Sequence, residues 1–187
     1  MRVVGVREFG GPDALEVVDV PEPHAGPGQV RIRVNAATVN PTDTFVTNGA
    51  RAEAQRADPP PYVPGMDAAG VLDEIGDGAD TDLQTGEHVM AIVLPKAAHG
   101  AYAEHIVVPV ESVARVPRGT SDAEASTLPM NGLTARLTLD LLDLKPGQTI
   151  AVTGAAGCYG GYVAATRSVT VPSSTCWRSR SSLSCSL

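Results

Sequence analysis

Short apolar runs separated by turn residues occupy residues 1–118, and this pattern limits the fold more than any other feature of the chain. In residues 29–36, Val, Ile and Ala alternate with Gln, Arg and Asn, the period of two expected of a strand with one buried face. Further runs, separated by Gly, Pro and Asp, lie at 2–9, 14–20, 67–76, 87–94, 101–109 and 112–117. About seven short strands over this length predict a barrel or a partly open barrel.

The periodicity of the apolar residues changes near residue 120 from that of strands to that of helices. Ser121 and Glu124 have the spacing of a capping box, so we expect a short helix to begin there and to stop at Pro129. A second helix is predicted over residues 132–144, because its leucines fall on one stripe.

A glycine-rich turn follows residues 149–153, a β-branched apolar run typical of a buried parallel strand. Three glycines with the spacing G-x-x-G-x-x-G precede an apparent helix start: Gly154, Gly157 and Gly160. Glycine lets the backbone approach a pyrophosphate, and the free amides of a helix start, here those of Cys158 and Tyr159, bind phosphate. No Lys-Ser/Thr pair follows, so this is not a Walker A loop. A tight strand-to-helix turn also needs glycine, so a purely structural interpretation stays open.

The composition changes abruptly after residue 165. Residues 166–187 contain eight serines and no carboxylate, whereas residues 1–165 contain three serines. A dinucleotide site needs an acidic residue or an arginine roughly 20 residues after the turn. Arg178 and Arg180 lie there, but no apolar run leads to them. We hypothesise that a shifted reading frame or an early stop produced this tail, and the other frames past codon 160 are expected to continue the domain.

Charge and cysteine content exclude several classes of protein. The formal charge of −7 argues against nucleic-acid binding, and no run approaches the roughly 20 apolar residues of a membrane span. No signal peptide is evident at the N-terminus. The cysteines, Cys158, Cys176 and Cys185, lack the spacing of a disulfide framework or a structural zinc site. A cytoplasmic location is therefore expected.

Several segments together resemble a known family. These are NPTDTFVTNG, PYVPGMDAAGVLDEIGDGA, TGEHVMAI, GAYAEHIVVP, LPMNGLTA and LKPGQTIAVTGAAG. In order and spacing they resemble the medium-chain dehydrogenase/reductase superfamily, and most of all its zinc-independent quinone oxidoreductase-like branch. The resemblance covers residues 1 to about 163. It implies a GroES-like barrel paired with a Rossmann domain and hydride transfer from NADPH to quinones or enones.

The resemblance implies a mainly β chain, in which a partly open GroES-like barrel is followed by linking helices and the truncated start of an α/β Rossmann domain. The predicted parts are a GroES-like catalytic domain at 1–118, linking helices at 119–143, the first Rossmann strand and glycine-rich turn at 144–165, and an atypical Ser-rich tail at 166–187. Complete family members are nearly twice this length, so the Rossmann domain is expected to be incomplete.

The resemblance also implies residues that bind the cofactor. The segment from Asn40 to Thr44 resembles one that lines the nicotinamide side of the family's cleft, and Phe45 takes a position often held by an aromatic residue. Thr134 resembles a threonine close to the nicotinamide. A core phenylalanine and a helix-face hydroxyl bonded to its own backbone are the alternatives for Phe45 and Thr134. The glycine turn, with Cys158 and Tyr159, completes the predicted NADPH site.

No metal ion is predicted. Zinc-dependent relatives place a Cys where this chain has Asn40 and a His-Glu pair where it has Met66 and Asp67, and neither Asn40 nor Met66 suits zinc. Asp67 is expected to be a turn carboxylate, and Tyr62 a packed ring. We assign no catalytic acid or base, because a quinone can take its proton from water.

The expected function is therefore that of an NADPH-dependent oxidoreductase acting on a small quinone or enone, with a possible homodimer and an activity that truncation can remove. The alternative is a non-catalytic GroES-like binding module or remnant. A third interpretation is complementation, in which a separate chain supplies the rest of the Rossmann domain.

Overall fold

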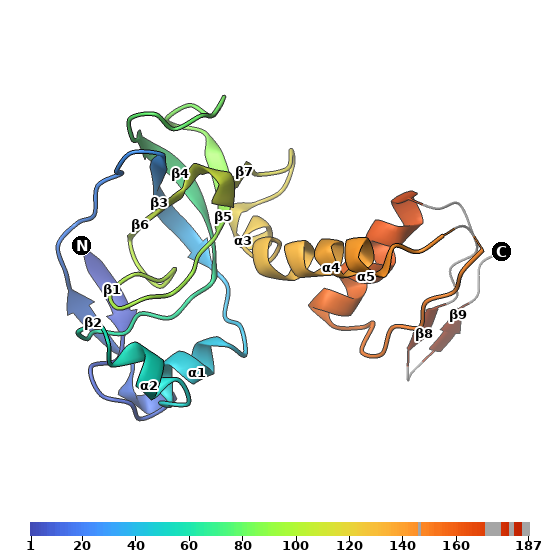
Figure 1. Ribbon diagram of the computed structural model, residues 1–187, viewed down its shortest axis with the longest axis horizontal. Helices are drawn as coiled ribbons and strands as arrows, with labels where there is room; N and C mark the ends of the chain where they lie inside the picture. The colour runs from blue at the N-terminus through green and yellow to red at the C-terminus, as the bar shows by residue number, and fades with distance from the viewer. Residues whose placement is uncertain (146, 171–176, 180–181, 185–187) are drawn as a thin grey trace. The chain divides into compact units, whose positions relative to one another are not determined.

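The computed structural model describes residues 1–145, 147–170, 177–179 and 182–184 (Figure 1). The chain divides into two compact units, Met1–Pro129 and Met130–Leu187, and each is described by itself. The first is built mainly of strands and the second mainly of helices, which confirms the predicted mainly β fold class with added helices. The four-part domain division proposed above stays a prediction.

A five-stranded antiparallel sheet and a two-stranded sheet form the first unit. The larger sheet has the order β6-β3-β4-β5-β7, with strands β3 (Gln29–Ala37), β4 (Asp67–Ile75), β5 (His88–Ile92), β6 (His105–Pro109) and β7 (Val113–Arg115). The smaller sheet pairs β1 (Arg2–Gly5) with β2 (Glu16–Asp19). All seven apolar runs of the sequence therefore contain a strand, as predicted.

Short helices connect these strands. They are the 3-10 helices η1 (Pro12–Ala14) and η2 (Val110–Ser112) and the α-helices α1 (Asp43–Thr47), α2 (Ala52–Gln55) and α3 (Asp122–Ala125). Helix α2 lies in a polar segment without apolar periodicity, where Ala, Glu and Gln have good helix propensity.

The core of the first unit comes from the alternating strands. Val30 and Ile32 of β3 are fully buried, while Arg33 between the strand's apolar residues is exposed, as the period of two predicts. They pack with Leu72 of β4 and with residues of β5 and β6 in one cluster. Partly buried Ala103 packs against this cluster and against a second one around Val3. The two sheets therefore enclose a shared interior.

Strands β3 and β4 bend where their pairing register shifts, between Arg31 and Ile32 and between Val34 and Ala36. Opposite the second shift lies Gly70, where an added Cβ would come within 2.0 Å of the Arg33 carbonyl oxygen. Because no side chain fits there, glycine permits the close backbone approach that lets the sheet curve.

Helix α3 begins with the predicted capping box. The Glu124 amide donates to Ser121 Oγ (3.3 Å), and the Ser121 amide donates to Glu124 Oε2 (2.9 Å). Asp122 fastens the helix to the sheet, because it accepts hydrogen bonds from Asn35 Nδ2 (2.7 Å) and contacts His88 Nδ1 (2.9 Å).

Replacing Ser121 with alanine is expected to lower the free energy of unfolding by about 1 kcal/mol, because an orphan helix amide loses its acceptor. Urea denaturation followed by far-UV circular dichroism measures the loss. Thr120→Ala is the matched control, because its hydroxyl does not cap the helix, and it should change stability by less than about 0.5 kcal/mol. Equal losses for both variants would show that the cap does not contribute.

The second unit contains helices α4 (Pro129–Leu142) and α5 (Cys158–Thr170) and an antiparallel pair of strands, β8 (Trp177–Ser179) and β9 (Ser182–Ser184). Helix α4 begins at Pro129 instead of near residue 132, because proline fits the first turn of a helix. Helix α5 runs past residue 165, where the predicted pattern was lost. Arg178 lies in the short strand β8, although no apolar run in the sequence leads to it.

One sequence-based prediction for this unit is wrong in the structure. Residues 149–153 are not a strand, since no described residue pairs with them, and a lone extended segment gains no ladder hydrogen bonds. The helix predicted over 132–144 is confirmed in α4, and its leucine stripe is exposed: Leu133, Leu137 and Leu141 are 45%, 58% and 88% exposed. None of the described helices combines the length and apolar character that crossing a bilayer requires.

Candidate functional site

A buried polar cluster lies where β3 leads into α1 and β4 begins. Asn40, Asp43 and Asp67 are 4%, 4% and 0% exposed. Asn40 Nδ2 donates to Asp67 Oδ2 at 2.6 Å, so the amide of the predicted cofactor residue has a fixed orientation. Asp67 is therefore not a turn carboxylate as expected, but a buried acceptor at the first position of β4.

Asp43 holds this cluster together from the first turn of α1. Its Oδ2 accepts hydrogen bonds from the backbone amide of Asn40 (2.7 Å) and from the Tyr102 hydroxyl (3.1 Å). Its Oδ1 accepts one from the backbone amide of Gly65 (3.0 Å). Burial, and then the negative charge of Asp43, raise the pKa of Tyr102 above its usual range. The carboxylate therefore joins three segments that are distant in sequence.

The other two predicted residues of the first unit lie on helix α1. Thr44 is exposed, and its hydroxyl donates to the Pro41 carbonyl oxygen at 2.6 Å. Phe45 is 41% exposed, which argues against the alternative of a core phenylalanine. The guanidinium carbon of Arg51 lies 5.9 Å from the centre of the Phe45 ring, in range of a cation–π contact.

Exposed apolar side chains flank the start of β4. The Thr38 amide donates to the Asp67 carbonyl oxygen (3.3 Å), and the Val93 amide donates to that of Met66 (2.8 Å). Val39 follows Thr38 in the chain and Leu94 follows Val93, and their side chains are 76% and 75% exposed. An aliphatic surface of this kind, beside a fixed amide, suits the face of a planar ring.

The side chains at the positions of the family's zinc ligands do not fit a zinc ion. Asn40 presents its Nδ2 donor to Asp67, and the Met66 sulfur accepts a hydrogen bond from the Thr42 hydroxyl at 3.2 Å. Zinc sites instead use thiolate, imidazole and carboxylate ligands. Across the described ranges, no three His, Cys, Asp or Glu side chains are grouped as a metal site requires.

Tyr62 is a packed ring, as predicted. It is 5% exposed and stacks on Phe9 with ring centres 5.1 Å apart. Its hydroxyl donates to the Asp58 carbonyl oxygen at 3.2 Å. The ring therefore belongs to the packing beneath α1 and α2.

The glycine turn of the second unit depends on glycine at two positions. Gly154 has a φ of +70°, a conformation that side chains disfavour, and its carbonyl oxygen accepts from the Gly157 amide at 2.9 Å. At Gly160, an added Cβ would lie 2.6 Å from the Gly154 oxygen and 2.7 Å from Ala155 Cα. The first turn of α5 therefore packs directly on the backbone of the preceding turn.

This packing places the amides of Cys158 and Tyr159 at the start of α5. The first amides of a helix have no intrahelical acceptor, and the helix dipole makes this end positive. The Cys158 thiol is exposed, and the Tyr159 hydroxyl donates to Thr138 Oγ1 at 2.9 Å, which joins α5 to α4. The arrangement fits a diphosphate held by main-chain atoms.

Thr134 also lies on α4, one turn before Thr138. Its hydroxyl donates to the Met130 carbonyl oxygen at 2.6 Å. This is the contact expected of a helix-face hydroxyl bonded to its own backbone, the alternative given for Thr134 in the sequence analysis. The predicted residues thus fall into two groups: Asn40, Thr44 and Phe45 belong to the first unit, and Thr134 and the glycine turn to the second.

Sequence reasoning placed Asp43 in the segment from Asn40 to Thr44 but gave it no role of its own, and it missed Gly65 and Tyr102 as parts of the site. The spacing of Asn40 and Asp43, typical of a side chain that accepts from a backbone amide three residues away, is a local signal for one of their bonds. The contacts to Gly65 and Tyr102 span 22 and 59 residues, so no local pattern indicates them.

Comparison with known proteins gives a consistent result. Residues 26–118 match the family model of the alcohol dehydrogenase GroES-like domain. The human "Synaptic vesicle membrane protein VAT-1 homolog-like" is 34% identical over 94% of this chain and 40% of its own length. Its crystal structure has a TM-score of 0.79, covering 92% of this chain and 53% of that chain.

Human quinone oxidoreductase is 32% identical over 86% of this chain and 47% of its own length. The structure of a mycobacterial protein complexed with NADPH is 29% identical with a TM-score of 0.73, covering 91% of this chain and 51% of that chain. The chain thus spans between 40% and 47% of the length of these two human relatives.

Proposed function

The chain belongs to the medium-chain dehydrogenase/reductase superfamily and contains its GroES-like domain, and from this we propose that it serves NADPH-dependent hydride transfer to a small quinone or enone. The observation that carries the proposal is the glycine turn, in which Gly160 has no room for a side chain and the amides of Cys158 and Tyr159 begin a helix. A mycobacterial relative that was solved complexed with NADPH supports the choice of cofactor.

In this proposal the second unit holds the cofactor's diphosphate. The amides of Cys158 and Tyr159 donate to its oxygens, and the positive end of α5 stabilises its charge. Gly154 and Gly160 let the backbone come close enough for these bonds to form. No lysine or arginine side chain is assigned to this contact.

The first unit, considered by itself, offers a surface that suits a nicotinamide ring. Asn40, buried and bonded to Asp67, anchors the segment that follows β3, and the exposed side chains of Phe45, Val39 and Leu94 supply apolar surface. When bound, NADPH supplies the hydride, while the protein contributes binding and orientation. We propose that the reaction is independent of zinc, because neither Asn40 nor Met66 suits the ion, and that it takes place in the cytoplasm.

Titration of the full chain with NADPH, followed by nicotinamide fluorescence and by calorimetry, tests the proposal. We expect a dissociation constant in the micromolar range. Reduced nicotinamide mononucleotide, which lacks the diphosphate bridge, is the matched ligand control and should bind at least about tenfold more weakly, since it forgoes charge-assisted hydrogen bonds. Equal affinity for the two ligands would exclude the role given to the glycine turn.

A non-catalytic GroES-like binding module is the second candidate. It is favoured by one observation: residues 149–153 pair with no described strand, although the first unit has a complete core of its own. No detectable NADPH binding by a chain with a folded, β-rich circular dichroism spectrum would support this candidate over the oxidoreductase.

A further inference from the structure

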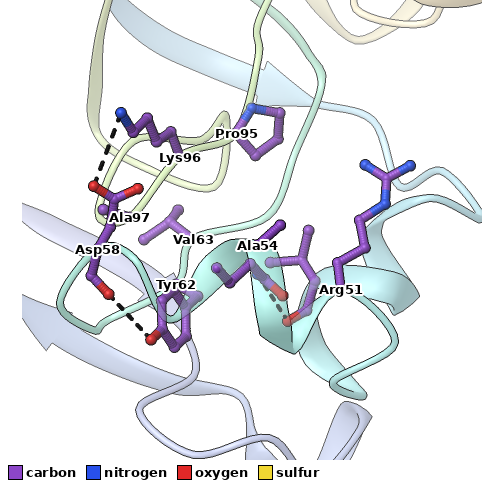
Figure 2. A pocket seen from close by; sticks show the side chains of 10 residues that line it. Arg51, Ala54, Asp58, Tyr62, Val63, Pro95, Lys96 and Ala97 are labelled. Carbon is purple, nitrogen blue, oxygen red and sulfur yellow. Dashed lines mark hydrogen bonds and ion pairs between the residues drawn. The ribbon is translucent and has the colours of Figure 1, made fainter.

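A pocket of about 170 Å³ lies in the first unit (Figure 2). It is formed by α1, by α2 and the segment after it, by the chain around Tyr62, and by the loop at residues 95–97. The lining residues are Val46, Arg51, Ala54, Gln55, Asp58, Tyr62, Val63, Pro95, Lys96 and Ala97. Figure 2 shows Arg51 on one side and Lys96 on the other, with Ala54 and Val63 between them.

Apolar residues form part of the pocket wall, and the rest of the wall is polar or charged. Val46, Tyr62 and Val63 are buried, and Pro95 and Ala97 complete the surface opposite α2. Ala97 has a φ of +50°, which is uncommon for a residue other than glycine, and its carbonyl oxygen accepts from the Val63 amide at 2.8 Å. Backbone in such a conformation persists where surrounding contacts fix it, and it recurs at ligand sites.

The charges of the pocket do not balance. Lys96 Nζ lies 3.8 Å from Asp58 Oδ1, so this cation has a carboxylate partner. Arg51 lies over the Phe45 ring, and no carboxylate of the described residues is within ion-pair distance of it. The lining therefore carries one net positive charge, although the whole chain carries a formal charge of −7. A monoanion would complete the balance.

The volume limits the size of the anion. A cavity of about 150 Å³ holds a benzene ring, whereas most pockets for drug-sized ligands measure roughly 300 to 1,000 Å³. At about 170 Å³ the pocket accommodates one ring or a short chain, but not a dinucleotide. The buried apolar part of the wall, formed by Val46, Tyr62 and Val63, favours an organic body over a fully hydrated inorganic ion.

We propose that this pocket binds a small organic monocarboxylate, with a flat apolar body no larger than one aromatic ring and its carboxylate at Arg51. The planar guanidinium matches a carboxylate with two parallel hydrogen bonds. Every lining residue belongs to Met1–Pro129, so binding requires neither the glycine turn nor a dinucleotide. The proposal therefore goes beyond the function proposed above and stands or fails separately from it.

The test uses the full chain without NADPH and follows benzoate by saturation-transfer NMR. Benzyl alcohol has the same ring and no charge, and we expect it to bind at least about tenfold more weakly, since it lacks the charge-assisted contact. Raising the salt concentration should weaken benzoate and leave benzyl alcohol unchanged. Inorganic phosphate should not displace benzoate at equal concentration.

Two variants distinguish the pocket from nonspecific attraction. Arg51→Gln should weaken benzoate binding about tenfold. Arg56→Gln, which removes an exposed charge outside the pocket lining, is the matched control and should leave the affinity unchanged. Ala54→Leu should reduce binding of benzoate and benzyl alcohol alike by filling the space. Circular dichroism confirms that each variant is folded.

The proposal is overturned if benzoate shows no saturation transfer, if benzyl alcohol binds as well as benzoate, or if the two arginine variants lose affinity equally. Displacement of benzoate by phosphate would show that the positive charge of the pocket attracts any small anion, and it would also overturn the proposal of an organic ligand. Because NADPH is absent from the sample, none of these results depends on the dinucleotide.

Discussion

Replacing Gly160 with alanine is expected to weaken NADPH binding by up to about 100-fold. The new Cβ would lie 2.6 Å from the Gly154 carbonyl oxygen and 2.7 Å from Ala155 Cα. Both are backbone atoms, so the whole turn must move away from α5, carrying the amide donors out of position. Overpacking of this kind costs about 1 to 3 kcal/mol, and each 1.4 kcal/mol is tenfold in affinity.

Gly161→Ala is the matched control, because the same substitution is made one residue further along α5. There the nearest atom to an added Cβ is the Ala155 carbonyl oxygen at 3.9 Å, an ordinary contact. Both substitutions raise helix propensity by the same amount, so the control isolates the steric effect. Titration by nicotinamide fluorescence measures both variants. Equal affinities would show that the contact between turn and helix does not position the diphosphate.

Replacing Asp43 with alanine is expected to lower the free energy of unfolding of the first unit by about 3 to 5 kcal/mol. The substitution leaves the amides of Asn40 and Gly65 and the hydroxyl of Tyr102 without their acceptor in a buried place. Each unsatisfied buried group costs roughly 1 to 3 kcal/mol. Denaturation in urea, followed by far-UV circular dichroism, measures the loss.

Asp13→Ala is the control for loss of a carboxylate, because Asp13 is exposed, and it should change stability by less than about 0.5 kcal/mol. Ultraviolet titration of the Tyr102 phenol gives a second measurement. Its pKa is raised first by burial and then by Asp43, so the alanine variant should lower that pKa while leaving it above the usual range. A stability loss below about 1 kcal/mol would contradict the role of Asp43 as the link between the three segments.

The parts of the fold that were predictable from sequence follow from local rules. The alternation in β3 and the capping box of α3 each depend on residues a few positions apart, and both are confirmed. The strand predicted at 149–153 depends instead on a partner elsewhere in a sheet. Its β-branched pattern is present in the sequence, but the described residues provide no such partner.

The candidate site shows the same division. Gly154 and Gly160 were identified from their spacing. The positive φ at Gly154 and the close backbone approach at Gly160 both favour glycine, which is visible in the sequence. The burial of Asp67 was missed, since a carboxylate at the start of a strand reads locally as a turn residue. Its burial follows from the pairing of β3 with β4 and from the contact with Asn40, 27 residues away.

In the proposed site, the Gly154–Gly160 turn binds the diphosphate through main-chain atoms only, and this affects how such a site would persist over evolution. Mutation changes side chains, and the proposed contact uses the main-chain amides of Cys158 and Tyr159: the Cys158 thiol is exposed, and the Tyr159 hydroxyl is bonded to Thr138. Drift at these two positions is thus expected to be tolerated, whereas any gain of bulk at Gly160 is not. In related sequences that keep the site, we therefore expect glycine, which has no Cβ, at the position of Gly160.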